Sequence, residues 1–187
     1  MTTHLFNQLC VFCGSKPGTG ARFGNAAEAL GSEMARRGID LVYGGASVGL
    51  MGQIANTVLD NGGHVTGVIP RGLFDEEIAH MGLTRLITVD SMHQRKDRMA
   101  SLSDGFIAMP GGFGTLEELF EAITWSQIRI HTKPIGMLNV DGYYDELHDF
   151  ISKCVDKGFI KPRHQALYVI HEDPGTLIDL MQSHFQG

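Results

Sequence analysis

Short apolar stretches that end in glycine or proline turns, each followed by a helical pattern, recur along this chain. Four of these stretches end at Gly14-Ser15, Gly44-Gly45, Pro70-Arg71 and Pro110-Gly111-Gly112. Strands that alternate with helices form a parallel sheet covered by helices on both faces. Ligands of such sheets bind outside the carboxyl ends of the strands, so these four turns are expected to converge on one site. The pattern predicts an α/β fold with a central parallel sheet flanked by helices in three layers.

This pattern extends along the whole chain, and we expect a single domain over residues 1–187. Strands are predicted at 9–13, 40–43, 64–69, 86–89, 106–109, 134–140 and 167–170. Helices are predicted at 21–37, from the second glycine turn to about 61, and at 92–103, 116–128, 144–157 and 174–185. Residues 71–84 are expected to form a longer loop, and loops of that length often carry function. The order of the strands does not follow from the pattern.

The segment from Pro110 to Glu118 is the most informative glycine turn, because it joins a predicted strand to a predicted helix. Its three glycines permit a tight turn and the close approach of a ligand. The free N–H groups and the positive dipole end of the helix suit a phosphate. Two carboxylates, Glu117 and Glu118, follow in the first turn. This mixture predicts a phosphate-bearing substrate with a carboxylate that takes part in the chemistry.

The helix that follows this turn allows two interpretations of Glu118. Its predicted core stripe is made of Leu116, Leu119, Phe120 and Ile123. Glu118 then lies on the opposite side and faces the mouth of the turn, and Ala122 and Trp125 share that outer side. An exposed tryptophan indicates an interface there. In the alternative interpretation, Thr115 and Glu118 form a capping box and have a purely structural role.

A cation interrupts an apolar stripe on the preceding helix. Met92, Arg95, Met99 and Leu102 fall on one face of that helix. A charge in an apolar stripe needs a partner. We interpret Arg95 as a residue that holds a carboxylate or a phosphate through its bidentate guanidinium. The alternative is an arginine that extends its charged end to the surface.

Other motifs indicate neither a metal site nor a cofactor site. The segment 44–52 is a glycine turn that matches neither a phosphate-binding P-loop nor a dinucleotide fingerprint, and it can equally be a tight packing turn. Cys10 and Cys13 point to opposite faces of a strand and are expected to be buried apolar residues rather than zinc or redox ligands. The nine histidines lack metal-ligand spacing. No Gly-x-Ser-x-Gly elbow is present, which argues against a serine hydrolase.

Composition restricts the partners and the compartment. The net charge of −6 without a basic block argues against nucleic-acid binding. No apolar run approaches the ~20 residues of a membrane span, and the N-terminus does not resemble a secretory signal. Three cysteines fit a reducing compartment better than a disulfide framework. We therefore expect a cytoplasmic protein that binds neither nucleic acid nor membrane.

Two motifs, Ser91 to Lys96 and Pro110 to Glu118, resemble those of the LONELY GUY family of cytokinin riboside 5′-monophosphate phosphoribohydrolases. The likeness extends over nearly the whole chain and also includes the segments 11–15, 41–45, 49–52, 123–125 and 138–144. The resemblance implies a Rossmann-like fold and an enzyme that hydrolyses the N-glycosidic bond of a nucleoside 5′-monophosphate. The products would be a free base and ribose 5-phosphate. It also implies a homodimer.

The resemblance also assigns residues. Arg95 and Glu118 match the catalytic pair of the family. The positions that match its substrate-binding residues are Glu77, Lys96, Gly112, Phe113, Gly114, Thr115, Leu116, Glu117 and Thr124. We add Gly111, Ser15 and Gly45 as substrate-binding candidates because they lie in the converging turns. In this interpretation the carboxylate of Glu118 stabilises positive charge on the ribose ring and activates water, and Arg95 holds Glu118 ionised or contacts the substrate.

Three alternatives stay open. The chain can be a nucleotide-binding or molybdenum-cofactor-binding module without catalysis. It can be a lysine decarboxylase, although that chemistry needs pyridoxal phosphate on a lysine and Lys96 is the only lysine near the predicted site. It can also be a nucleosidase with a broader range of purine or pyrimidine nucleotides, because the preferred base depends on the shape of the pocket.

Overall fold

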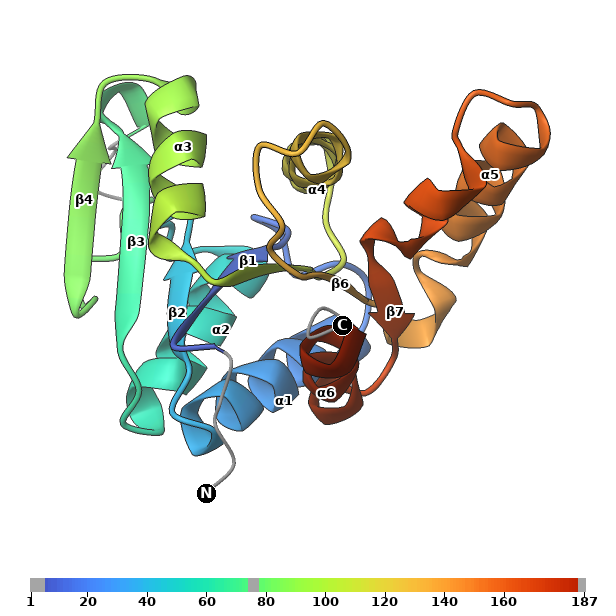
Figure 1. Cartoon of the computed structure of the whole chain (residues 1–187). Coiled ribbons are helices and arrows are strands. Elements are labelled where there is room, and N and C mark those ends of the chain that lie inside the picture. The colour runs from blue at the N-terminus through green and yellow to red at the C-terminus, as the bar shows by residue number, and fades with distance from the viewer. Residues whose placement is uncertain (1–5, 74–77, 185–187) are drawn as a thin grey trace.

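The computed structural model describes residues 6–73 and 78–184. Within these residues seven strands form one parallel sheet in the order β4-β3-β2-β1-β5-β6-β7 (Figure 1). The strands are β1 (Gln8–Phe12), β2 (Asp40–Tyr43), β3 (Val65–Pro70), β4 (Arg85–Val89), β5 (Gly105–Ala108), β6 (Ile135–Leu138) and β7 (Val169–His171). The predicted α/β fold with a central parallel sheet is confirmed.

Six α-helices cover the two faces of the sheet in the described part of the chain. They are α1 (Arg22–Arg36), α2 (Gly49–Asp60), α3 (Met92–Leu102), α4 (Phe113–Gln127), α5 (Asp145–Asp156) and α6 (Pro174–His184). Short 3₁₀ helices lie at η1 (Arg71–Leu73), η2 (Val140–Gly142) and η3 (Pro162–Leu167). One apolar cluster joins α1, α2 and α6 to the sheet, and a second joins α3, α4 and α5 to its other face (Figure 1).

The position of β1 in the sheet places the ligand-binding edge. The chain proceeds outward from β1 through β2, β3 and β4, and then returns to add β5, β6 and β7 on the other side of β1. The loops after β1 and β5 therefore leave the sheet in opposite directions, and a crevice opens between them. The N–H of Gly14 donates to the carbonyl of Pro110 at 3.1 Å across this boundary. The two glycine turns that the sequence singled out thus lie side by side.

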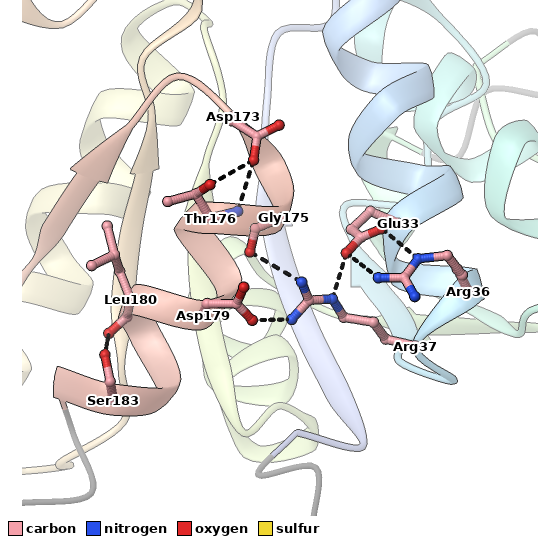
Figure 2. A network of polar contacts seen from close by, with 9 residues as sticks. All are labelled: Glu33, Arg36, Arg37, Asp173, Gly175, Thr176, Asp179, Leu180 and Ser183. Atoms are coloured by element: carbon pink, nitrogen blue, oxygen red, sulfur yellow. Dashed lines mark hydrogen bonds and ion pairs between the residues drawn. The ribbon is translucent and has the colours of Figure 1, made fainter. Parts of the chain in front are cut away.

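A polar network joins α1 to α6 (Figure 2). The guanidinium of Arg37 donates to Glu33 at 2.6 Å, to Asp179 at 2.5 Å and to the carbonyl of Gly175 at 3.1 Å. Arg36 also donates to Glu33. These hydrogen bonds lower the pKa of Glu33 to about 2 although partial burial opposes the shift. The network fixes the packing of two helices that cover the same face of the sheet.

The predicted element bounds differ from the structure mainly at two ends. Helix α4 begins at Phe113, three residues before the predicted start, with Gly112 as its N-cap. Thr115 therefore lies inside the first turn, and the capping-box interpretation is wrong. Strand β6 ends at Leu138 rather than at Val140, because Val140 begins η2. The other strand and helix ends lie within three residues of their predicted positions.

Candidate active site

A cleft of about 430 Å³ opens over the carboxyl ends of β1, β2 and β3. Residues from five chain segments, within 11–15, 44–51, 69–78, 92–95 and 112–118, enclose it. Its lining residues are Val11, Phe12, Cys13, Gly14, Ser15, Gly44, Ala46, Met51, Ile69, Pro70, Ile78, Met92, Arg95, Gly112, Phe113, Gly114, Thr115, Glu117 and Glu118. The predicted convergence of the four turns on one site is confirmed, since residues of all four line this cleft.

The N-terminus of α4 forms one wall of the cleft. The first bond of its backbone ladder runs from the N–H of Leu116 to the carbonyl of Gly112 at 3.1 Å. The preceding N–H groups, from Gly112 to Thr115, therefore have no acceptor within the helix and are available to an anion. A Cβ at Gly111 would overlap the hydroxyl of Thr115, so only glycine fits there. A Cβ at Gly112 would meet no protein atom within 4 Å.

Arg95 reaches from α3 across the cleft toward Glu118 of α4. Its Nη1 lies 3.6 Å from Oε1 of Glu118, and the two side chains are only 13% and 10% exposed. The Nε of Arg95 donates to the carbonyl of Val68 at 3.2 Å, which holds the guanidinium in place. A Cβ at Gly44 would overlap that guanidinium, so the glycine after β2 makes room for it. The interpretation of Arg95 as the partner of a carboxylate is confirmed, and the surface alternative is wrong.

The ionisation of Glu118 is shifted into the neutral range. Burial raises the pKa of Glu118 to about 7, although the nearby charge of Arg95 acts to lower it. Among the described residues, its buried Oε1 has no hydrogen-bond partner. A carboxyl group with a pKa near neutral pH can exchange a proton with a substrate or with water. A buried oxygen without a hydrogen-bond partner, at the wall of a cleft, is a position at which a ligand or water would be stabilised.

The predicted core stripe of α4 is shifted by one position from the observed one. Leu119 and Ala122 are buried against the sheet, whereas Phe120 is 38% exposed. Ala122 is therefore not on an outer side, and Glu118 is not opposite the core but at its border with the cleft. Trp125 is half-buried and lines a small hollow beside Glu118 and Ala122. The observed buried stripe of α4 consists of Thr115, Leu119 and Ala122.

The predicted binding residues divide into three groups. Ser15, Gly112, Phe113, Gly114, Thr115 and Glu117 line the cleft, and Gly111 borders an adjoining cavity of about 400 Å³. Four others are not among the described residues that line the cleft: Gly45, Lys96, Leu116 and Thr124. Glu77 lies outside the described residues.

Lys96 lies beside the cleft and is held by two carboxylates. Its Nζ donates to Glu117 at 2.5 Å and to Glu121 at 2.6 Å, and its side chain is largely buried. Partial burial acts to lower the pKa of Lys96, but the two hydrogen bonds outweigh it and raise the pKa overall. Lys96 therefore joins α3 to α4 next to the Arg95–Glu118 pair.

The sequence pattern missed the apolar wall of the cleft. Met51, Ile69, Ile78 and Met92 line it. Met92 lies on the same predicted stripe as Arg95, and its exposure distinguishes it from the buried Met99. Met51 and Ile69 lie near the ends of predicted elements, and Ile78 lies in the predicted loop over residues 71–84, which are the signals that could have identified them.

Cys10 and Cys13 belong to the two different core clusters and are both buried, as predicted. In residues 6–73 and 78–184 no group of histidine, cysteine and acidic residues is arranged to hold a metal ion. Nor does any helix in these ranges have the length and apolar character needed to cross a membrane.

The comparisons with known proteins agree with the resemblance of the motifs. The model of a family described as possible lysine decarboxylase matches residues 51–181. The probable cytokinin riboside 5′-monophosphate phosphoribohydrolase LOGL1 of Oryza sativa subsp. japonica is 58% identical over 96% of this chain and 80% of its own length. The LOG2 enzyme of Arabidopsis thaliana, a cytokinin riboside 5′-monophosphate phosphoribohydrolase, is 49% identical over 98% of this chain and 86% of its length.

Solved structures show the same fold in more distant proteins. The molybdenum cofactor carrier protein of Chlamydomonas reinhardtii superposes with a TM-score of 0.72 at 23% identity, over 96% of this chain and 98% of that chain. The molybdenum cofactor binding protein of Rippkaea orientalis superposes with a TM-score of 0.70 at 24% identity, over 94% and 95% of the two chains. At these identities the likeness concerns the fold alone.

Proposed function

The chain belongs to the LONELY GUY family of phosphoribohydrolases, and we propose that it hydrolyses the N-glycosidic bond of adenosine 5′-monophosphates, both N6-modified and unmodified. The products are the free base and ribose 5-phosphate. The observation that carries this proposal is the Arg95–Glu118 ion pair, which lies in the cleft beside the N-terminus of α4. Burial raises the pKa of Glu118 in this pair to about 7.

The geometry supports separate binding positions for the phosphate and the ribose of the substrate within the cleft. The phosphate of the substrate binds the N–H groups from Gly112 to Thr115, at the positive end of α4. This contact is remote from the reacting bond and supplies positioning energy. The ribose then lies toward Glu118, one turn further along the helix.

The chemical step places positive charge on the ribose ring as the bond to the base breaks. The carboxylate of Glu118 stabilises that charge and orients the attacking water. Water supplies a hydroxyl to the anomeric carbon and a proton to the departing base, so no co-reactant is needed. Arg95 acts to lower the pKa of Glu118 against the effect of burial, because a positive charge 3.6 Å away favours the carboxylate.

The base is proposed to lie against the apolar wall of the cleft. Ile69, Ile78 and Met92 form this wall, and Phe113 is almost fully exposed at its edge. An alkyl group on N6 of the purine would cover part of this surface and would gain free energy from its burial. Cytokinin precursors are therefore expected to be better substrates than AMP.

An assay of base release tests the proposal. Purified protein is incubated with AMP, N6-isopentenyl-AMP and adenosine, and free base and ribose 5-phosphate are separated by HPLC. Release from the two monophosphates and not from the nucleoside is expected, with release by the Glu118→Gln variant lowered at least about 100-fold. Equal rates with AMP and adenosine would contradict the assignment of the phosphate site. No release from any nucleotide would refute the proposed activity.

The description of the family as possible lysine decarboxylase is not favoured by Lys96. A lysine that forms a Schiff base must reach its neutral form, whereas the carboxylates of Glu117 and Glu121 raise the pKa of Lys96. Incubation with lysine in the same assay is expected to yield no cadaverine.

We also propose that the chain forms a homodimer through the face that carries α4 and α5. Phe120, Ile128, Ile130 and Phe150 are large apolar side chains that are exposed on or just after these helices. A second copy of the chain would bury them, as such residues are in subunit interfaces. Light scattering after size exclusion is expected to give twice the chain mass, and Phe150→Asp is expected to shift it toward the monomer. Phe159→Asp, a substitution of another exposed phenylalanine beyond α5, serves as the control.

A further inference from the structure

Three successive carbonyl groups of the turn between β5 and α4 are each held by a hydrogen bond. The carbonyl of Met109 accepts from the hydroxyl of Tyr144 at 2.7 Å. The carbonyl of Pro110 accepts from the N–H of Gly14 at 3.1 Å. The carbonyl of Gly111 accepts from the hydroxyl of Tyr143 at 2.6 Å. Two adjacent tyrosines therefore hold two carbonyls of this turn.

The peptide between Gly111 and Gly112 is the one that most needs such a restraint. Neither residue has a Cβ, so the backbone on both sides of the peptide can adopt more conformations than at any other residue type. The peptide is planar and trans, so its N–H points away from its carbonyl. When Tyr143 holds the carbonyl of Gly111, it fixes the N–H of Gly112 on the opposite side.

The loop that carries the tyrosines is itself ordered by side-chain contacts. The Oδ1 of Asn139 accepts from the N–H of Tyr144 at 2.7 Å, and its Nδ2 donates to Asp145 at 2.7 Å. Asp141 has a left-handed backbone with φ of 55° and pairs with Arg22 at the start of α1. The tyrosine hydroxyls are thus placed by contacts that do not involve the cleft.

The two tyrosines differ in their surroundings. Tyr144 is 1% exposed and packs in the core under α5, and its bond to Met109 is buried. Tyr143 is 41% exposed, meets the ring of Phe23 edge-on and lines the cavity that adjoins the cleft. Loss of the Tyr144 hydroxyl would leave a carbonyl buried without a partner, whereas water could reach the carbonyl freed by loss of the Tyr143 hydroxyl.

We propose that Tyr143 is a positioning residue for phosphate recognition: its hydroxyl holds the carbonyl of Gly111 away from the cleft and presets the N–H of Gly112 toward the anion. Without this bond the glycine peptide can rotate and present its carbonyl to the phosphate. The inference rests on the proposed function in that the anion is the 5′-phosphate of the substrate. Tyr144 holds the start of the same turn and mainly stabilises the fold.

Tyr143→Phe removes only the hydroxyl and tests this role. Binding of inorganic phosphate is measured by calorimetry, the kinetics are measured with AMP, and the melting temperature is measured on the same samples. The Kd for phosphate and the KM for AMP are expected to rise roughly five- to tenfold, about the value of one hydrogen bond. The kcat is expected to stay within about twofold and the melting temperature within about 1 °C, because the exposed carbonyl is then solvated.

Two further variants separate positioning from stability. Tyr144→Phe is expected to lower the melting temperature by several degrees, because it leaves a buried carbonyl unsatisfied. Tyr168→Phe, which removes a hydroxyl that contacts His148 at 2.9 Å away from the cleft, is expected to change none of the phosphate measurements.

An unchanged Kd for phosphate in Tyr143→Phe would overturn the inference, and so would wild-type protein that binds no phosphate. A fall in melting temperature as large as that of Tyr144→Phe would make the role of Tyr143 structural and would also overturn it. If the wild-type protein binds phosphate and Tyr143→Phe weakens that binding, but no nucleotide is hydrolysed, then the proposed function fails while this inference stands.

Discussion

Replacing Arg95 by glutamine is expected to shift the pH dependence of activity toward higher pH. The pKa of Glu118 is about 7, because burial raises it and the guanidinium of Arg95 partly opposes that rise. The proposed reaction needs the ionised carboxylate, so kcat/KM should increase with pH through about 7 and level off above it. Without the positive charge, the carboxylate is less favoured and its pKa rises further.

The distance between the charges of Arg95 and Glu118 sets the size of this pKa shift. Two unit charges 3.6 Å apart interact with ~4.6 kcal/mol at an effective dielectric constant of about 20. At about 1.36 kcal/mol per pKa unit, the upper limit is a shift of ~3 units. Both side chains retain some contact with water, which screens the pair, so a shift of about 1–2 units is expected.

Two measurements follow the ionisation of Glu118. The first is kcat/KM for AMP from pH 5 to 10, fitted to the pH of half-maximal activity. The second is the NMR titration of ¹³C-labelled glutamate carboxyls, assigned with Glu118→Gln, which reports the pKa even if Arg95→Gln lowers the rate strongly. Arg98→Gln makes the same change on the same helix, away from the residues that line the cleft, and should leave both midpoints in place.

Coincident midpoints in the wild-type protein and Arg95→Gln would refute the reasoning. Arg95 would then not act on the ionisation of Glu118, and any loss of rate would come from lost contacts with the substrate. A midpoint shifted to lower pH would likewise contradict the electrostatic account.

Four other substitutions have expected outcomes. Glu118→Gln should lower kcat/KM by roughly 10²–10⁴-fold in the HPLC assay, since a general base contributes about that much. Circular dichroism of this variant should show an intact fold. Retained activity would mean that Glu118 has only a structural role. Gly112→Ala should fold normally but bind phosphate more than about tenfold more weakly in calorimetry, because its Cβ enters open space at the N-terminus of α4. Gly111→Ala should lower the melting temperature, because its Cβ overlaps the side chain of Thr115 in the first turn of α4. Equal melting temperatures of these two variants would contradict this reasoning. Arg37→Ala should lower the melting temperature by roughly 2–6 °C at pH 7, from about 1–2 kcal/mol of lost ion pairing. Because the pKa of Glu33 is lowered to about 2 in the folded state, that difference should shrink as the pH falls from about 4.5 toward 2, and a difference that persists at pH 2 would show that it does not depend on charge.

The central strands β1, β2, β3 and β5 were predictable because each is a short, buried apolar run that a glycine or proline turn ends. The start of α4 was not predictable in the same way. Its N-cap is Gly112, which has no side chain to act as a cap, whereas the sequence pattern indicates the polar residue Thr115 as a candidate cap. Two overlapping apolar stripes fit this segment, and the predicted one places Phe120 in the core although it is 38% exposed.

The sequence by itself determined the local chemistry. It placed a glycine turn before a helix, with a carboxylate one turn later, and it marked Arg95 as a cation that needs a partner. These conclusions hold because turn geometry, helix dipoles and periodicity depend on residues close together in the chain.

Only the tertiary structure decided which groups act together. The reversal of strand order at β1 brings α3 and α4 to the same cleft, and so places Arg95 3.6 Å from Glu118. Tertiary packing also raises the pKa of Glu118 to about 7. It likewise brings the hydroxyl of Tyr143 within hydrogen-bond distance of the carbonyl of Gly111. Burial and electrostatic interaction depend on distances in space between segments that are remote in the chain, and the fold alone sets those distances.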